Sequence, residues 1–413
     1  MTLKRLALAC VVIAIGAFVL AHLPGPAAGP RASGRSPEPT VKGSPAQSGA
    51  LAGSTRFFVP KAPPGAVRQI TGLRSQGRDG DARLVKAMVD VPRATWVTGG
   101  SAADAAREVR EVVHQADRDR SVPVLVLYNV PGRDCSQGSA GGASSGSAYR
   151  TWIAAIADAL ADSKAIVLLE PDGIALLPGD CNQPDPFGRL DLIAAAGRAL
   201  KDDTNARIYL DAGHSRWHPT AEISRRLAEA GIDHVDGFFE NVANYQTTEQ
   251  ATAWGHWVAR CVWYGTHIQK GGFASCPNQF DAPNPDDPGT WQLIDALYGD
   301  LVGDVSAEDL PHFVVDTSRN GRGPWTPPPG ASGDQQVWCN PPGRGLGIRP
   351  TAATGDSLVD AYLWVKVPGE SDGQCVRGTA GPRDPVRDRV DPFAGQWFPD
   401  FALELARNAN PPL

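Results

Sequence analysis

The chain has no excess of basic residues: its 39 lysines and arginines stand against 45 aspartates and glutamates, a net charge of −6 over 413 residues. A protein that holds the phosphate backbone of a nucleic acid needs a basic surface, so nucleic acid is not an expected partner. Charged residues make up only 20% of the chain and hydrophobic residues 42%. This composition is typical of a globular protein and excludes a chain that is disordered throughout.

The motifs of several common chemistries are also missing. No G-x-G-x-x-G follows a predicted strand and no G-x-x-x-x-G-K-[ST] occurs, so nucleotide phosphate binding has no support. There is no C-x-x-C pair, and no predicted helix carries His214 and His218, which argues against a metal site. A G-x-S-x-G match at 142–146 follows a polar loop, whereas a serine-hydrolase elbow requires an apolar strand before it. We therefore expect neither a metal nor an organic cofactor.

The N-terminal segment has the pattern of an export signal. Lys4 and Arg5 precede an apolar run that extends to about residue 20, followed by small residues. We predict a signal peptide over 1–28, with an uncleaved membrane anchor as the alternative, and a flexible Pro/Gly/Ser/Ala-rich tether over 29–54. Of the seven cysteines, all except Cys10 lie beyond the signal, and an exported chain favours disulfides among them. The chain is expected to be secreted, or tethered to the membrane if the signal is retained.

Short apolar runs alternate with helical patterns through the rest of the chain, which we predict to be one catalytic domain over 55–413. The alternation predicts an α/β fold with a parallel sheet, because strands covered on both faces are apolar throughout. A doubly wound sheet and a closed barrel both fit, and the count of about seven strands favours barrel-like closure. The predicted strands are 94–97, 122–128, 165–169, 206–210, 235–239, 313–315 and 361–365. Helical stretches between them include 102–116, 148–161, 190–199 and 221–230.

Acidic and amide residues follow six of these strands directly. Because the carboxyl ends of parallel strands share one rim, side chains far apart in the sequence are expected to meet there. A lone aspartate after a strand is a common turn residue, but a whole rim of acids beside tryptophan, tyrosine and arginine favours a site. Clustered carboxylates repel, so one of them should have a raised pKa. A protonated acid beside an ionised base is what hydrolysis of a glycosidic bond requires.

Six segments along the chain resemble glycoside hydrolase family 6, which contains bacterial and fungal endoglucanases and cellobiohydrolases. In order, they are Tyr128-Asn-Val-Pro-Gly-Arg-Asp-Cys135, Glu170-Pro-Asp172, Tyr209-Leu-Asp-Ala-Gly-His214, Asn241-Val-Ala-Asn-Tyr245, Trp338-Cys-Asn340 and Trp364-Val-Lys-Val-Pro-Gly-Glu-Ser-Asp372-Gly. The resemblance extends from about residue 55 to the C-terminus. It implies a distorted seven-stranded parallel (β/α) barrel, similar to a TIM barrel, that hydrolyses β-1,4-glucosidic bonds with inversion and without a cofactor.

The resemblance also implies roles for the rim residues. Asp172 corresponds to the general acid, and Asp134 to the carboxylate that raises the pKa of the acid and supports the charge developing on the sugar. Asp372 corresponds to the residue proposed as general base through water, and Asp211 to a further carboxylate of the site. Tyr128 lies where the family has a tyrosine beneath the distorted sugar. Among the substrate-binding positions, Trp96, Trp217 and Trp338 match stacking tryptophans, His214, Asn241, Arg319, Lys366 and Glu370 match residues that hydrogen-bond sugars, and Ser139 matches a holder of the catalytic water.

Family members pair the cysteine after the first aspartate with one beyond the acid, which here implies a Cys135–Cys181 disulfide. A second family pair implies Cys339–Cys375, and we predict that the remaining two, Cys261 and Cys276, pair with each other.

The expected activity is that of an endoglucanase, with an exo-acting cellobiohydrolase of the same family as the alternative. A glucan-binding protein without catalysis is the rival from another class, and the presence of all four aspartates argues against it. We expect a monomer with β-1,4-glucan as its partner.

Overall fold

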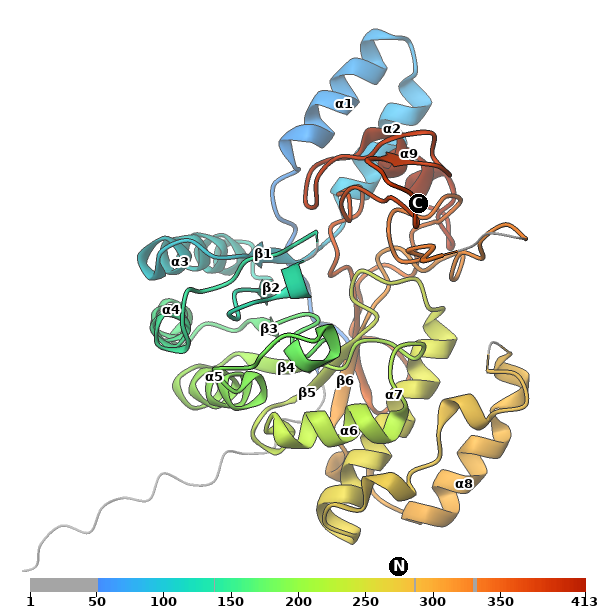
Figure 1. Ribbon diagram of the computed structural model, residues 1–413. Coiled ribbons are helices and arrows are strands. Elements are labelled where there is room, and N and C mark those ends of the chain that lie inside the picture. Colours follow the sequence, from blue (N-terminus) through green and yellow to red (C-terminus); the bar gives the residue numbers. More distant parts are fainter. Residues whose placement is uncertain (1–50, 137, 286, 330–332) are drawn as a thin grey trace, which may run out of the picture. The chain divides into compact units, whose positions relative to one another are not determined.

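One sheet of parallel strands, paired in chain order, forms the framework of the computed structural model (Figure 1). The structure describes residues 51–136, 138–285, 287–329 and 333–413. All seven predicted strands are confirmed within two residues at each end. The strands are β1 (Thr95–Val97), β2 (Val124–Leu127), β3 (Ile166–Leu169), β4 (Arg207–Asp211), β5 (Gly237–Glu240), β6 (His312–Asp316) and β7 (Val359–Leu363), with a separate antiparallel pair, β8 (Arg383–Asp384) and β9 (Arg389–Val390).

Helices follow most strands, and the four predicted ones are confirmed as α3 to α6. The α-helices of the described residues are α1 (Pro64–Ser75), α2 (Asp79–Val89), α3 (Ala102–Arg118), α4 (Gly146–Leu160), α5 (Arg189–Asp203), α6 (Thr220–Glu229), α7 (Thr248–Trp263), α8 (Gln292–Val302) and α9 (Pro399–Arg407). Several have side-chain caps at their N-termini, such as Ser101 before α3 and Ser145 before α4. None of the described helices is long and apolar enough to cross a membrane.

The two faces of the sheet are both buried, which explains the continuous apolar runs. Successive side chains of a strand point to opposite faces. On β3, Val167 and Leu169 belong to the core between the sheet and helices α3 to α7, whereas Ile166 and Leu168 belong to the core inside the curved sheet. A third core packs α1, α2 and α9 around Trp364 and Tyr245, near the strand ends.

The sheet curls strongly enough for strands that are not neighbours to touch across its interior. Tyr209 on β4 donates a hydrogen bond to Asp360 on β7 at 2.6 Å, although β5 and β6 lie between them in the sheet. The edge strands β1 and β7 do not pair as strands, but the Ala94 N–H reaches the Trp364 carbonyl at 2.9 Å just outside them. The predicted distorted barrel is therefore confirmed, with its wall open between the first and last strands.

The three predicted disulfides are present: Cys135–Cys181, Cys261–Cys276 and Cys339–Cys375. The first joins the loop after β2 to the loop after β3, and the third holds the segment after β7 against residues that follow β6. The predicted signal over 1–28 and the predicted tether over 29–54, as far as residue 50, lie outside the described residues.

A glutamate at the end of β5 leads to a prediction about stability. The Glu240 side chain is fully buried where α7 crosses at Gly255, and neither carboxyl oxygen has a hydrogen-bond partner among the described residues. Burial raises the pKa of Glu240 well above its usual range. As the pH rises above the ordinary pKa of a glutamate, the unfolded chain releases a proton that the folded chain retains. The free energy of unfolding therefore falls by up to about 1.4 kcal/mol per pH unit from this group.

Replacing Glu240 with leucine is expected to stabilise the protein, and to do so more at about pH 7 than at about pH 4. Denaturant unfolding at both pH values measures this difference. Glu240→Gln is the matched control, because it retains a buried polar group of the same size but cannot titrate. Its free energy of unfolding should lack only the pH-dependent contribution that Glu240 makes. An equal gain at both pH values for the leucine variant would contradict the assignment.

Candidate active site

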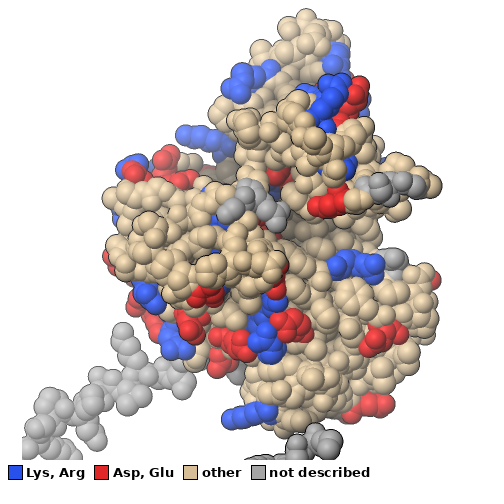
Figure 2. Space-filling view, viewed as in Figure 1, with Lys and Arg blue, Asp and Glu red and all other residues tan. Residues whose placement is uncertain are grey.

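A pocket of about 710 Å³ opens where the strands end. Its walls come from Trp96 on β1 and from segments that follow β1 to β7, as expected for the carboxyl-terminal rim of a parallel sheet. Most of the residues predicted from the sequence line it, namely Trp96, Tyr128, Asp134, Ser139, Asp172, His214, Trp217, Trp338, Lys366, Glu370 and Asp372. Acidic and basic side chains are interspersed on the face shown in Figure 2, so the charge concentrated in the pocket does not continue as a patch of one sign over that face.

Three predicted residues lie behind the pocket wall instead of lining it: Asp211, Asn241 and Arg319. Asn241 is fully buried, and its amide nitrogen donates to the carbonyls of Gln246 and Asp316, both at 3.0 Å. Its amide oxygen accepts from the Gln246 N–H at 3.0 Å. The side chain of Asn241 is thus occupied in fixing the loop after β5. In this structure it has no access to the pocket, where the predicted contact with a sugar would be made.

The carboxyl group of Asp172 has no hydrogen-bond partner among the described residues. Asp172 is half-buried and lines the pocket. Both Glu170 and Asp172 have positive φ, 55° and 63°, on either side of Pro171. Non-glycine residues adopt this region rarely and at some energetic cost, and such strain is concentrated at functional sites. The strained turn directs the Asp172 side chain into the pocket rather than into a hydrogen bond of its own loop.

The surroundings of Asp172 raise its pKa well above the usual range of an aspartate. Burial is the largest cause, and the negative charges of Asp211 and Asp134 add to it, while the positive charge of Lys366 opposes it. Burial also raises the pKa of Asp134, although the Ser139 N–H, 2.5 Å from its carboxylate, opposes that shift. Asp172 therefore retains its proton to a higher pH than an ordinary aspartate, as a general acid requires.

Asp211 fixes the loop that carries the acid. Its carboxylate accepts hydrogen bonds from the Ala175 N–H at 3.0 Å and the Gly213 N–H at 3.1 Å. Burial raises the pKa of Asp211 to about 6, against the effect of these N–H groups and those of Ile174 and Asp172. Asp211 thus acts on Asp172 twice, by holding its backbone turn and by placing a carboxylate close to it.

Two other buried carboxylates hold the rim together. Glu170 accepts from the N–H groups of Asn129 and Val130 at 2.9 to 3.0 Å, which ties the loop after β2 to the end of β3. Asp316 at the end of β6 accepts from the Val365 N–H at 3.1 Å and the Lys366 N–H at 3.0 Å, beyond β7. Each bond joins segments that follow neighbouring strands. Some acids at the strand ends therefore hold the loops together, and only the others face the pocket.

Asp372 is surrounded by positive charge and hydrogen-bond donors. The buried Arg319 guanidinium contacts both carboxylate oxygens at 2.9 and 2.8 Å, and the Asn340 N–H donates at 3.0 Å. The Tyr245 hydroxyl lies at 3.4 Å and the Lys366 ammonium at 3.7 Å. The orientation of the Asp372 carboxylate is thereby fixed, in contrast to that of Asp172.

Aromatic side chains form the walls on either side of the acids. The Trp96 ring lies edge-on to Tyr128, with centroids 5.6 Å apart, and its indole N–H donates to the Val365 carbonyl at 2.8 Å. On the other side, Trp217 packs 5.6 Å from the His214 ring. Burial lowers the pKa of His214 to about 3, and its Nδ1 accepts from the Arg216 N–H at 3.2 Å. The imidazole is therefore neutral and carries its proton on Nε2, free to donate to a ligand.

Arg133 is a pocket residue that the sequence analysis did not single out. Its guanidinium lies 4.5 Å from the centre of the Tyr128 ring. Nη1 donates to the carbonyls of Tyr128 and Thr98, and Nε donates to the Ser139 carbonyl at 2.8 Å. Arg133 thus fixes the loop that carries both Asp134 and Ser139. Its position directly before Asp134 in the sequence was the only available signal.

Comparisons with known proteins agree with this geometry. The sequence profile of glycosyl hydrolases family 6 matches residues 52–409. The chain is 36% identical over 334 residues to endoglucanase A of Cellulomonas fimi, covering 80% of this chain and 57% of that protein. It is 30% identical over 363 residues to exoglucanase-6A of Humicola insolens, covering 79% of this chain and 68% of that protein. The chain therefore spans little more than half the length of the bacterial relative.

Solved structures resemble the fold as well. The endoglucanase Cel6 of Mycobacterium tuberculosis, in complex with methyl-cellobiosyl-4-deoxy-4-thio-β-D-cellobioside, is similar with a TM-score of 0.64 and 31% identity. The match covers 86% of this chain and 97% of that one. A cellobiohydrolase catalytic core from Chaetomium thermophilum follows at a TM-score of 0.61 and 26% identity. A profile match over most of the chain, a bacterial relative at 36% identity and the shared barrel together show that this protein belongs to glycosyl hydrolases family 6.

Proposed function

We propose that the protein hydrolyses β-1,4-glucosidic bonds of cellulose-type glucans with inversion at the anomeric carbon. The observation that carries the proposal is Asp172, a carboxyl group that faces the pocket without a hydrogen-bond partner and has a raised pKa. In the proposed reaction, Asp172 donates its proton to the leaving oxygen as water attacks from the opposite side of the sugar. Asp134 and Asp211 maintain the pKa of the acid, and Asp134 supports the positive charge that develops on the ring.

Asp372 is our proposed base, acting through water. Its four partners compensate its charge, so a proton passed to it would have to weaken a strong ion pair with Arg319. In the proposed step, the attacking water passes its proton through a short hydrogen-bond chain to the Asp372 carboxylate, whose contact with Arg319 weakens as it accepts the proton. Ser139, whose backbone is fixed by Asp134 and Arg133, is the proposed partner for that water. Trp96, Trp217 and Trp338 are the proposed platforms for sugar rings, with His214, Lys366 and Glu370 as partners for hydroxyl groups.

Endo cleavage is the finer part of the proposal. Support comes from relatives named as endoglucanases in Cellulomonas fimi and two Streptomyces species, whereas a relative in Humicola insolens is named as an exoglucanase. The three disulfides favour an oxidising compartment, which is consistent with the proposed export. We propose residues 55–413 as the catalytic domain and a monomer as the active form.

Two measurements test this function. Proton NMR of the first product from cellohexaose should show the α-anomer, because inversion converts a β-linkage into an α-hemiacetal. A first product in the β form would overturn the mechanism. On soluble carboxymethyl cellulose, endo action should lower viscosity quickly relative to the release of reducing ends. A slow fall in viscosity with the same release of ends would favour the cellobiohydrolase alternative.

A further inference from the structure

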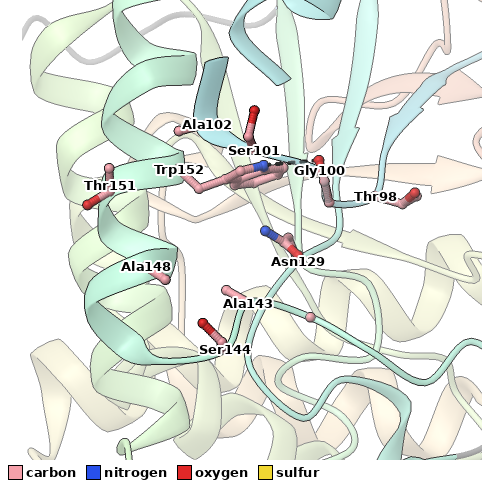
Figure 3. A pocket seen from close by; sticks show the side chains of 12 residues that line it. Thr98, Gly100, Ser101, Ala102, Asn129, Ala143, Ser144, Ala148, Thr151 and Trp152 are labelled. Atoms are coloured by element: carbon pink, nitrogen blue, oxygen red, sulfur yellow. Dashed lines mark hydrogen bonds between the residues drawn. The ribbon is translucent and has the colours of Figure 1, made fainter. Parts of the chain in front are cut away.

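A second cavity lies beside the proposed active site and has no part in the proposed mechanism. It has a volume of about 520 Å³, within the range of about 300–1,000 Å³ that is usual for small-molecule sites. We call it the side pocket, and it is formed by residues 98–102 after β1, Asn129, residues 142–144, and Ala148, Thr151 and Trp152 of α4 (Figure 3). Its floor is stabilised where the Trp152 indole N–H donates to the Gly99 carbonyl at 3.3 Å.

The side chain of Asn129 is unsatisfied and faces this cavity. Its exposed fraction is 5%, and its carboxamide has no hydrogen-bond partner among the described residues. The backbone of Asn129 is fixed on both sides, since its N–H donates to Glu170 and its carbonyl accepts from the Ala143 N–H at 2.8 Å. Figure 3 shows the amide directed into the space between Trp152, Ala148 and Ala143. Because no described residue occupies the amide, its donor and acceptor atoms are available to a molecule in the cavity.

The lining of the side pocket indicates which ligand chemistry fits. It offers the hydroxyl groups of Thr98 and Ser144 beside the Asn129 amide, and no lining residue carries a charged side chain. The Ser101 hydroxyl caps α3, and the Thr151 hydroxyl donates to the Ser147 carbonyl at 3.1 Å. The amide can donate and accept at once, as vicinal hydroxyl groups of a sugar require. An anion would face the first turn of α3, where Asp104 lies paired with Arg107 at 2.6 Å, and the lining itself offers no cation to an anion. A neutral polyhydroxylated molecule is therefore favoured over a phosphate or a carboxylate.

The side pocket adjoins the proposed active site. Thr98 lines both cavities, and the Arg133 guanidinium that donates to the Thr98 carbonyl lies on the active-site side of this boundary. A glucan lying in the active-site pocket would thus pass close to the entrance of the side pocket. A sugar attached to that glucan as a branch could enter it without leaving the chain.

We propose that the side pocket binds a neutral sugar unit attached as a branch to the glucan in the active site, so that substituted β-1,4-glucans are substrates. This inference rests on the proposed function. It assigns Asn129 as the residue that recognises the branch, with the hydroxyl groups of the lining as further partners. A free monosaccharide has the same chemistry, and the experiment below separates the two sources.

The test compares xyloglucan, a β-1,4-glucan with pendant xylose, with unbranched cellohexaose. Ala148→Leu fills the pocket from α4, and Asn129→Leu removes the amide at similar size. Each should lower kcat/KM on xyloglucan by about tenfold, the effect of one or two lost hydrogen bonds, and change kcat/KM on cellohexaose by less than about twofold. Ala154→Leu, the same substitution at an exposed position of α4, is the matched control and should change neither value. Thermal unfolding checks that all variants are folded.

The outcomes separate this inference from the function on which it rests. Equal losses on both substrates for Ala148→Leu, or no loss on either, would overturn the inference, as would a native protein that hydrolyses cellohexaose but not xyloglucan. A native protein that hydrolyses neither substrate would overturn the proposed function itself. Ligand-observed NMR with free xylose and glucose tests the other source. Binding that Ala148→Leu abolishes, without a selective loss on xyloglucan, would show a free-sugar site and overturn the attached branch.

Discussion

Replacing Asp172 with alanine is expected to reduce hydrolysis of cellohexaose by about 10²- to 10⁴-fold, the usual contribution of a general acid. The glucosyl oxygen of an unactivated substrate leaves as a poor anion unless it receives a proton. Among the described residues, no hydrogen bond occupies the carboxyl group of Asp172, and its pKa is raised both by burial and by the neighbouring carboxylates Asp211 and Asp134. A dinitrophenyl cellobioside, whose leaving group needs no proton, should retain most of its rate in the same variant.

The comparison between the two substrates makes the experiment specific. A loss of structure or of substrate binding would lower both rates, whereas loss of the acid lowers only the first. The control is Asp162→Ala, which removes an exposed aspartate from the end of α4. The pH profile of the native protein gives an independent check. Its activity on cellohexaose should decline at high pH, where Asp172 loses its proton, and this decline should be absent with the dinitrophenyl substrate. Equal losses on both substrates would remove Asp172 from the role of acid.

Replacing Arg319 with methionine is expected to destabilise the protein by about 3–5 kcal/mol, the cost of leaving one partner of a buried ion pair alone. The side chains of Arg319 and Asp372 are 0% and 4% exposed, and the Arg319 guanidinium also donates to the Ala243 carbonyl at 2.5 Å. Lys366 at 3.7 Å is then the one cation that the structure shows beside Asp372 among the described residues. Denaturant unfolding measures the loss.

A surface pair provides the matched comparison. Arg383 and Asp388 are 2.8 Å apart, with side chains 59% and 85% exposed, so Arg383→Met should cost less than about 1 kcal/mol. The double variant Arg319→Met with Asp372→Asn should be more stable than Arg319→Met alone, because it removes the uncompensated charge. If Arg319→Met and Arg383→Met had similar effects, the buried pair would not have the structural importance assigned to it.

The strands could be predicted from the sequence because burial on both faces of the sheet requires nearly every strand residue to be apolar. In β3 the run Ile166-Val-Leu-Leu169 is apolar throughout, and its alternate side chains enter two different cores. The clustering of polar residues at one rim could be predicted from the strands, since the carboxyl ends of parallel strands lie at the same edge of the sheet. The sequence analysis did not single out α1, α2 and α9, which pack together with segments far apart in the chain.

The strand pattern does not distinguish the acids of the rim that face the pocket from those that are buried against backbone N–H groups. Glu170 and Asp172 are two residues apart and follow the same strand. One is completely buried against the backbone N–H groups of Asn129 and Val130, about 40 positions earlier, and the other faces the pocket. Arg319 and Asn241, predicted to contact sugars, are instead buried behind the pocket wall. The hydrogen bonds that decide each case join distant segments, and no local pattern records them.

The sequence by itself determined that this is an α/β chain with acids and aromatic residues at the ends of its parallel strands, because periodicity and strand order are local properties. Only the tertiary structure decided which of those acids face the pocket and which are buried in hydrogen bonds to other loops. Burial and the distance between charges set a pKa, and both depend on how the strand-end loops pack against one another. The same packing left the amide of Asn129 without a partner beside the active site, a feature that the sequence does not reveal.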